Sequence, residues 1–120
     1  MKEIQNYING KFQPPVDGRT IDDINPATGE IIGTVPASTS DDVQQAVDAA
    51  NGARTAWASL TIDERVNWLD KIANSLESQS EKIASLESLD TGKPISLARA
   101  VDAARSVTNF RFFAKFAKDY

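Results

Sequence analysis

The pattern of apolar and polar residues changes near residue 40. Before it, short apolar runs alternate with polar residues and are separated by Gly, Pro, Asn and Asp, which is typical of strands joined by turns. After it, apolar residues recur every three or four positions, which is typical of amphipathic helices. The pattern therefore predicts a β-hairpin arm over residues 1–36 and a helical region over residues 40–120.

Two β-hairpins are predicted in the arm. The first is centred on Asn9-Gly10, because both residue types tolerate the positive φ angles of a type I′ turn. The second joins strands at 20–24 and 30–35 through the turn NPATG, in which Pro and Gly suit the first and last turn positions.

Four helices are predicted in the rest of the chain. The first begins after Thr39 or Ser40, and the T-x-x-E capping box at Thr61 opens the second. A shorter third helix follows the interruption SQS, and the fourth runs from about Ile95 to the chain end. This last helix is apolar around much of its circumference, with two stripes: Leu97, Val101, Ala104, Thr108 and Phe112 on one, and Phe110, Phe113, Phe116 and Tyr120 on the other.

The segment ESLDTGKP, residues 87–94, reads as a helix end followed at once by a helix start. Gly92 can adopt the left-handed conformation that closes a helix, and Lys93 lies near enough to interact with the last carbonyls. Pro94 suits the opening turn of the next helix. Taken by itself, the segment is a plain corner between two helices.

Composition and charge exclude several classes of partner. The 120 residues carry a net charge of −4, whereas nucleic acid and anionic membranes reward clustered Lys and Arg. No apolar run approaches the roughly 20 residues that span a bilayer, and no signal peptide is evident. We therefore expect a cytoplasmic protein with neither nucleic acid nor membrane as partner.

Catalytic chemistry is absent from these residues. With no Cys and no His, the sequence excludes a thiolate nucleophile, a Ser–His pair and a Cys/His metal site. Its six glycines form neither a dinucleotide-binding motif nor a P-loop. We predict no catalytic and no cofactor-binding residue in residues 1–120, and we expect this segment alone to be inactive.

Five motifs, in this order, resemble the N-terminal region of the aldehyde dehydrogenase superfamily. They are NYINGKF, NPATGEIIGTV, the Ala-rich helix ending in WASL, the TxxER helix start, and ESLDTGKP. The resemblance implies an α/β fold in the complete protein, with residues 1–120 as the N-terminal part of its NAD(P)-binding domain. The aromatic last helix has no clear end, so we expect the chain to be part of a longer protein.

Residues 97–114 look most like the branch of 2-aminomuconic and 2-hydroxymuconic semialdehyde dehydrogenases, although Ala103-Ala104 stands where that branch often has Ile-Pro. The resemblance implies oxidation of a small carboxylate-bearing aldehyde with NAD or NADP, by a homo-oligomer (dimer or tetramer). The catalytic Cys, the Glu base and the cofactor loop would lie outside these residues. The alternatives are a betaine-aldehyde-like or general aldehyde dehydrogenase, and a non-catalytic α+β interaction module.

The resemblance also implies two sites. By similarity to betaine-aldehyde enzymes, Asp23, Ile24 and Asp90 would bind a monovalent cation; the alternative for Asp90 is a hydrogen bond to nearby backbone. By similarity to the muconic-semialdehyde branch, Arg105 would bind the substrate carboxylate. The alternative for Arg105 is an ion pair with Asp102, three residues earlier on the same helix.

Overall fold

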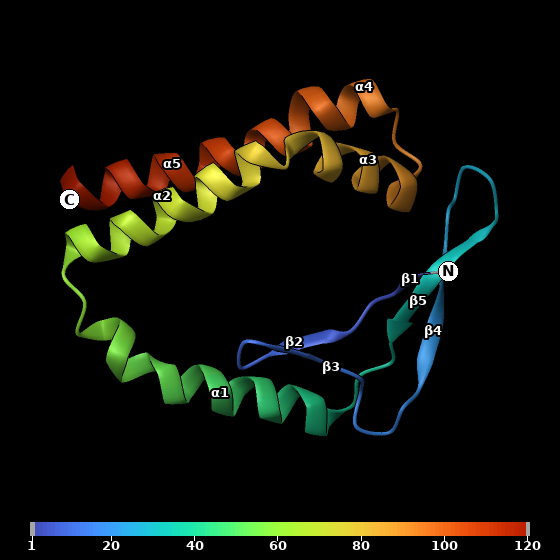
Figure 1. The fold of residues 1–120 in the computed structure, drawn as a ribbon, viewed down its shortest axis with the longest axis horizontal. Coiled ribbons are helices and arrows are strands. Elements are labelled where there is room, and N and C mark those ends of the chain that lie inside the picture. Colours follow the sequence, from blue (N-terminus) through green and yellow to red (C-terminus); the bar gives the residue numbers. More distant parts are fainter. Residues whose placement is uncertain (1, 120) are drawn as a thin grey trace. The chain divides into compact units, whose positions relative to one another are not determined.

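The computed structural model describes residues 2–119, which form two compact units divided between Ala58 and Ser59 (Figure 1). The first unit holds all the strands and one helix. The second unit is entirely helical.

The first hairpin of unit one has the predicted turn. Strands β2 (Asn6–Ile8) and β3 (Lys11–Gln13) pair antiparallel, with Tyr7 opposite Phe12. The φ angles of Asn9 and Gly10 are 51° and 76°, as a type I′ turn requires. The rings of Tyr7 and Phe12 lie 4.9 Å apart on the hairpin, which adds a cross-strand contact to the backbone ladder.

The second hairpin is also confirmed, and it belongs to a three-stranded sheet of order β1-β5-β4. Strands β4 (Thr20–Ile24) and β5 (Ile31–Pro36) pair antiparallel, while β1 (Lys2–Glu3) joins β5 in parallel. The sequence pattern does not predict β1, because a two-residue strand has too few positions to show a period. The register shifts between Asp23 and Ile24, which marks a β-bulge in this hairpin.

A buried carboxylate organises the first unit. Asp42, in the first turn of α1 (Ser40–Ala58), is only 2% exposed. Its Oδ2 accepts hydrogen bonds from the Thr39 backbone N–H at 2.8 Å and from the Thr39 hydroxyl at 3.0 Å. Its Oδ1 accepts from the Val16 N–H at 2.9 Å and from the Asn6 amide at 3.5 Å. Asp42 thus ties the start of α1 to the first hairpin and to the loop after it.

The second unit begins with the predicted capping box. Ahead of α2 (Ile62–Ser78), the Glu64 N–H donates to the Thr61 hydroxyl at 3.2 Å, and the Thr61 N–H donates to the Glu64 carboxylate at 2.7 Å. The capping box thus gives hydrogen-bond partners to two backbone N–H groups and one carboxylate at the N-terminal end of α2. At its other end, Gln79 separates α2 from α3 (Ser80–Thr91).

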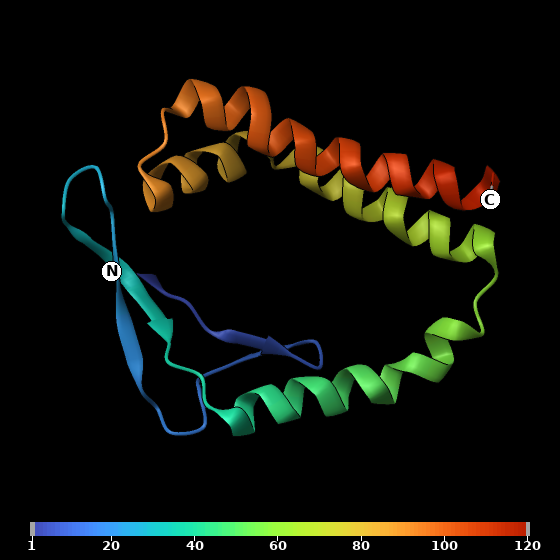
Figure 2. The same cartoon turned by 180° about the vertical axis from the view of Figure 1, so that it is seen from behind.

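The last helix doubles back on α2 and α3. It consists of α4 (Ile95–Leu97), a π-helical segment η1 (Ala98–Ala103) and α5 (Ala104–Asp119), which follow one another without a break. Figure 1 and Figure 2 both show α5 beside α2 and α4 beside α3. Together these segments form an antiparallel helical hairpin.

Small residues fill the contact between the two arms of that hairpin. The buried apolar side chains of unit two are Val66, Ala73, Ala84, Ala98, Ala103, Val107 and Ala114. Because most of them are alanines, the helix backbones can approach closely, but little apolar area is removed from water.

The predicted apolar stripes of the last helix are largely exposed. Leu97, Val101 and Phe112 of the first stripe are exposed, as are Phe113 and Phe116 of the second; Tyr120 lies outside the described residues. The buried positions step by five residues from Ala98 to Ala103, and by four from Ala103 to Val107. The π segment accounts for the difference, since its wider turn adds one residue that a regular α-helix would not contain.

Asp42 should make the stability of the protein depend on acid pH. The Thr39 backbone N–H, with that of Val16 and the Thr39 hydroxyl, lowers the pKa of Asp42 below its ordinary value of 3.8. A lowered folded-state pKa contributes stability above the ordinary pKa, and this contribution is lost as pH falls through the folded value. We expect Asp42→Asn to lower the free energy of unfolding at pH 7, and the difference from wild type to shrink toward pH 3.

Urea unfolding of the wild type and the variant at several pH values measures this. The control is Asp41→Asn, since the neighbouring Asp41 is exposed and its side chain makes no hydrogen bond within residues 2–58. A difference between Asp42→Asn and wild type that stays constant from pH 7 to pH 3 would contradict the role assigned to this carboxylate.

Candidate functional site

The corner between α3 and α4 is held by short side chains. Gly92 adopts the left-handed conformation with φ 69°, as predicted, and closes α3. The Ser88 hydroxyl donates to the Lys93 carbonyl at 2.6 Å, and the Thr91 hydroxyl donates to the Glu87 carbonyl at 2.6 Å. The Lys93 N–H donates to the Thr91 hydroxyl at 3.4 Å, so side chains contact the Lys93 backbone at both its N–H and its carbonyl.

Lys93 bridges two carboxylates. Its Nζ lies 3.0 Å from Oε1 of Glu87 on α3 and 2.6 Å from Oδ2 of Asp102 on η1. Hydrogen bonds to Asp102 and then Glu87 raise the pKa of Lys93, so the ammonium stays charged. The expected interaction of Lys93 with the last helix carbonyls is replaced by this bridge, which joins the corner to the π segment.

Arg105, the predicted substrate-binding residue, lies in the first turn of α5 and is exposed. Its alternative partner, Asp102, is bound to Lys93 instead. Within residues 59–119, Arg105 makes no ion pair and no side-chain hydrogen bond. Its guanidinium therefore has all its donors available.

The other two arginines of the last helix are paired. The Arg99 Nε donates to Glu81 on α3 at 2.7 Å, and the Arg111 Nη1 donates to Glu77 on α2 at 3.0 Å. Both arginines line a groove of about 310 Å³ with Ala103, Ala104 and Thr108 among its walls. Because each guanidinium already meets a carboxylate, this groove offers no free arginine to an anion.

The predicted cation ligands fall in different units. Asp23 and Ile24 lie in β4 at the bulge of the second hairpin, in unit one. Asp90 lies on α3 in unit two, where it is exposed and its side chain makes no hydrogen bond within residues 59–119. The alternative, that Asp90 hydrogen-bonds local backbone, is thus wrong, because Ser88 and Thr91 serve the corner instead. The joint cation site stays a prediction.

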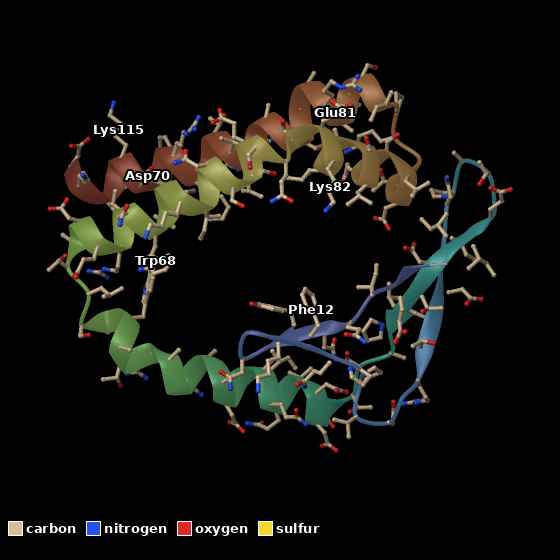
Figure 3. The ribbon with its side chains drawn as sticks, viewed as in Figure 1. Phe12, Trp68, Asp70, Glu81, Lys82 and Lys115 are labelled. Carbon is tan, nitrogen blue, oxygen red and sulfur yellow. The ribbon has the colours of Figure 1, made fainter. Side chains whose placement is uncertain are left out.

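Large apolar side chains are exposed in both units. Phe12 points away from α1 and Trp68 points away from α5 in Figure 3; they are 72% and 49% exposed. On α5, the Phe112 ring contacts those of Phe113 and Phe116, at centroid distances of 5.2 and 6.1 Å, and all three are exposed. Exposed aromatic clusters of this kind are typical of surfaces that other chain segments cover.

Two structural features of residues 2–119 bear on the class of protein. No helix of this part of the chain combines the length and apolarity needed to cross a bilayer. Nor does this part contain three or more acidic, Cys or His side chains grouped as metal ligands.

Comparison with protein families matches residues 12–120 to the family described as "Aldehyde dehydrogenase family". The chain belongs to the aldehyde dehydrogenase family. This confirms the family to which the five motifs pointed, and with it the fold class, because helices and short strands arranged as here occur in solved aldehyde dehydrogenases.

Relatives within the aldehyde dehydrogenase family include muconic-semialdehyde enzymes. A 2-hydroxymuconic semialdehyde dehydrogenase from Pseudomonas sp. strain CF600 is 38% identical, over 99% of this chain and 25% of the relative. A 2-aminomuconic semialdehyde dehydrogenase from Homo sapiens is 44% identical, over 92% of this chain and 22% of the relative. The structure of PnpE in complex with nicotinamide adenine dinucleotide aligns with a TM-score of 0.94 at 41% identity, over 98% of this chain and 24% of that one. The structure of PnpE from Pseudomonas sp. WBC-3 aligns with the same values. This aldehyde dehydrogenase chain thus spans about a quarter of the length of its relatives.

A larger side chain at Gly92 should destabilise the corner between α3 and α4. Because its φ is 69°, Gly92→Ala should lower the free energy of unfolding by about 1 kcal/mol. Gly52 lies inside α1 with nothing near its Cβ position, so Gly52→Ala should raise that free energy by roughly 0.5–1 kcal/mol. Urea unfolding of the two variants measures both changes; an unchanged or raised free energy of unfolding in Gly92→Ala would contradict the assigned corner geometry.

Proposed function

We propose that this chain is the N-terminal part of the NAD(P)-binding domain of an enzyme that oxidises a carboxylate-bearing aldehyde to the acid. Support comes from the family match over residues 12–120 and from the relatives named as semialdehyde dehydrogenases. In the overall reaction, aldehyde, NAD⁺ and water give carboxylate, NADH and two protons. The same comparisons favour an enzyme over a non-catalytic interaction module.

NAD is the cofactor we propose, with NADP as the alternative, because solved relatives are described as complexes with nicotinamide adenine dinucleotide. NAD supplies the hydride acceptor of the reaction. Residues 1–120 contain neither Cys nor His, so the thiolate nucleophile must come from elsewhere in a complete protein. The part left to the residues described above is to bind and orient the substrate.

The free guanidinium of Arg105 is the observation that carries the carboxylate assignment. Arg99 and Arg111 on the same helix each pair with a Glu, whereas Arg105 does not pair within residues 59–119. A planar guanidinium donates two parallel charge-assisted hydrogen bonds to a carboxylate. Such a contact would fix the acid end of the substrate and so orient the aldehyde toward the nucleophile.

Three further features of the complete protein belong to the proposal. It is a homo-oligomer, dimer or tetramer, and it is located in the cytoplasm, both by resemblance to the family. It binds a monovalent cation through Asp23, Ile24 and Asp90. The Asp90 carboxylate, which makes no hydrogen bond or ion pair within residues 59–119, supports the last point, because a hard cation requires available oxygen atoms.

Arg105→Ala should change substrate preference in the complete enzyme. Each charge-assisted hydrogen bond contributes roughly 1.5–3 kcal/mol, so loss of the pair should lower kcat/KM for a carboxylate-bearing aldehyde by about two orders of magnitude or more. For a neutral aldehyde of similar size the change should be small. The control is Arg111→Ala, whose guanidinium already binds Glu77 and which should affect both substrates alike. Equal losses on both substrates with Arg105→Ala would contradict the assignment.

Asp90→Asn should reduce stabilisation by potassium. If Asp90 supplies a carboxylate ligand, the wild-type melting temperature of the complete protein should rise with potassium, and that rise should be smaller in the variant. Thermal melts in potassium and in tetramethylammonium salts at equal ionic strength measure the difference. Glu81→Gln is a control for the loss of one charge on the same helix. If potassium raises the melting temperature of Asp90→Asn as much as that of the wild type, the assignment of Asp90 as a cation ligand is wrong.

A further inference from the structure

We propose that Lys93 is a positioning residue for Arg105: by binding Asp102, it keeps the nearest carboxylate on the helix from pairing with the substrate-binding guanidinium. The inference rests on the proposed role of Arg105. In this proposal Lys93, at the ESLDTGKP corner, affects substrate binding through Asp102 and Arg105 and does not contact the substrate itself.

Two basic side chains compete for Asp102. The Ser106 hydroxyl donates to the Asp102 carbonyl, four residues back, at 2.9 Å, and Arg105 follows Asp102 by three positions, where the π segment passes into α5. With this spacing, residues three apart lie on neighbouring positions of the helix surface, and acidic and basic side chains there form ion pairs. Asp102 therefore has two candidate partners, Arg105 on its own helix and Lys93 at the corner.

Lys93 is the partner that binds, because it is already held in place. Lys93 and Asp102 are about one-third exposed, at 28% and 32%, and their charged atoms are 2.6 Å apart. Glu87 holds the same ammonium at 3.0 Å, and Ser88 fixes the Lys93 backbone. Lys93 is thus oriented before it meets Asp102, whereas Arg105 is a long, exposed side chain that loses more conformational freedom on pairing.

Release of Asp102 would weaken the binding of an anionic substrate. Part of the Arg105 population would then be occupied by Asp102, and the apparent dissociation constant for a carboxylate would rise by the inverse of the free fraction. Exposed ion pairs of this type change such an equilibrium by about two- to fivefold. A neutral aldehyde does not need the guanidinium, so its binding should not change.

The test uses Lys93→Met in the complete enzyme. We expect KM for a carboxylate-bearing aldehyde to rise about two- to fivefold with kcat unchanged, and KM for a neutral aldehyde to stay the same. Adding Asp102→Asn to Lys93→Met should restore the original KM, because no carboxylate is left to compete. The matched control is Glu87→Gln, which removes the other partner of Lys93 but leaves its contact with Asp102.

Lys93→Met should also be made in the Arg105→Ala variant. This double variant shows whether Lys93 acts through Arg105 or whether its positive charge acts directly on the substrate. If Lys93 acts through Arg105, Lys93→Met should change nothing further there, whereas a direct field on the substrate would persist. A Lys93→Met effect that persists in this background, or that is equal for both aldehydes, overturns the inference. Should Lys93→Met lower the melting temperature, Lys93→Gln gives the same comparison with a polar side chain at the corner.

The two proposals fail in different ways. Equal losses on both aldehydes with Arg105→Ala overturn the carboxylate site and the role of Lys93 together. A selective loss with Arg105→Ala, combined with an unchanged KM in Lys93→Met and Lys93→Gln, overturns only the role of Lys93.

Discussion

Close packing of small side chains is the constraint on which the helical unit depends. Ala84, Ala98 and Ala103 form one buried cluster, and Ala73 and Ala114 are buried farther along the helices. Alanine lets two helices approach closely but contributes little apolar area, so register must be specified by other means. Ion pairs between the arms, from Arg99 to Glu81 and from Arg111 to Glu77, serve that purpose.

The charge arrangement at the corner is a consequence of the same packing. Because α4 and η1 lie against α3, the corner lysine meets carboxylates from both arms of the helical hairpin. Arg105 has no partner among residues 59–119, in contrast to Arg99 and Arg111 on the same continuous helix. The packing of η1 on α3 brings Lys93 to Asp102, and this contact leaves the Arg105 guanidinium available.

Turns and helix ends could be predicted from the sequence, whereas contacts between residues far apart in the chain could not. The turn at Asn9-Gly10, the capping box at Thr61 and the helix end at Gly92 each depend on a few adjacent residues, and all three were correct. The role of the buried Asp42 was not predicted, since its bonds to Asn6 and Val16 span residues far apart in sequence. Spacing also placed Asp102 within reach of Arg105, but could not show that Lys93 reaches it too.

The π segment of the last helix has a consequence for how this region can change length. A wide turn accommodates one extra residue without rotating the rest of the helix, whereas one inserted residue elsewhere in an α-helix rotates everything beyond it by about 100°. Residues 98–103 are therefore the place where the helix could lose a single residue and still present Val107 and Ala114 to α2. Related sequences that differ in length by one residue in this helix should carry the gap there.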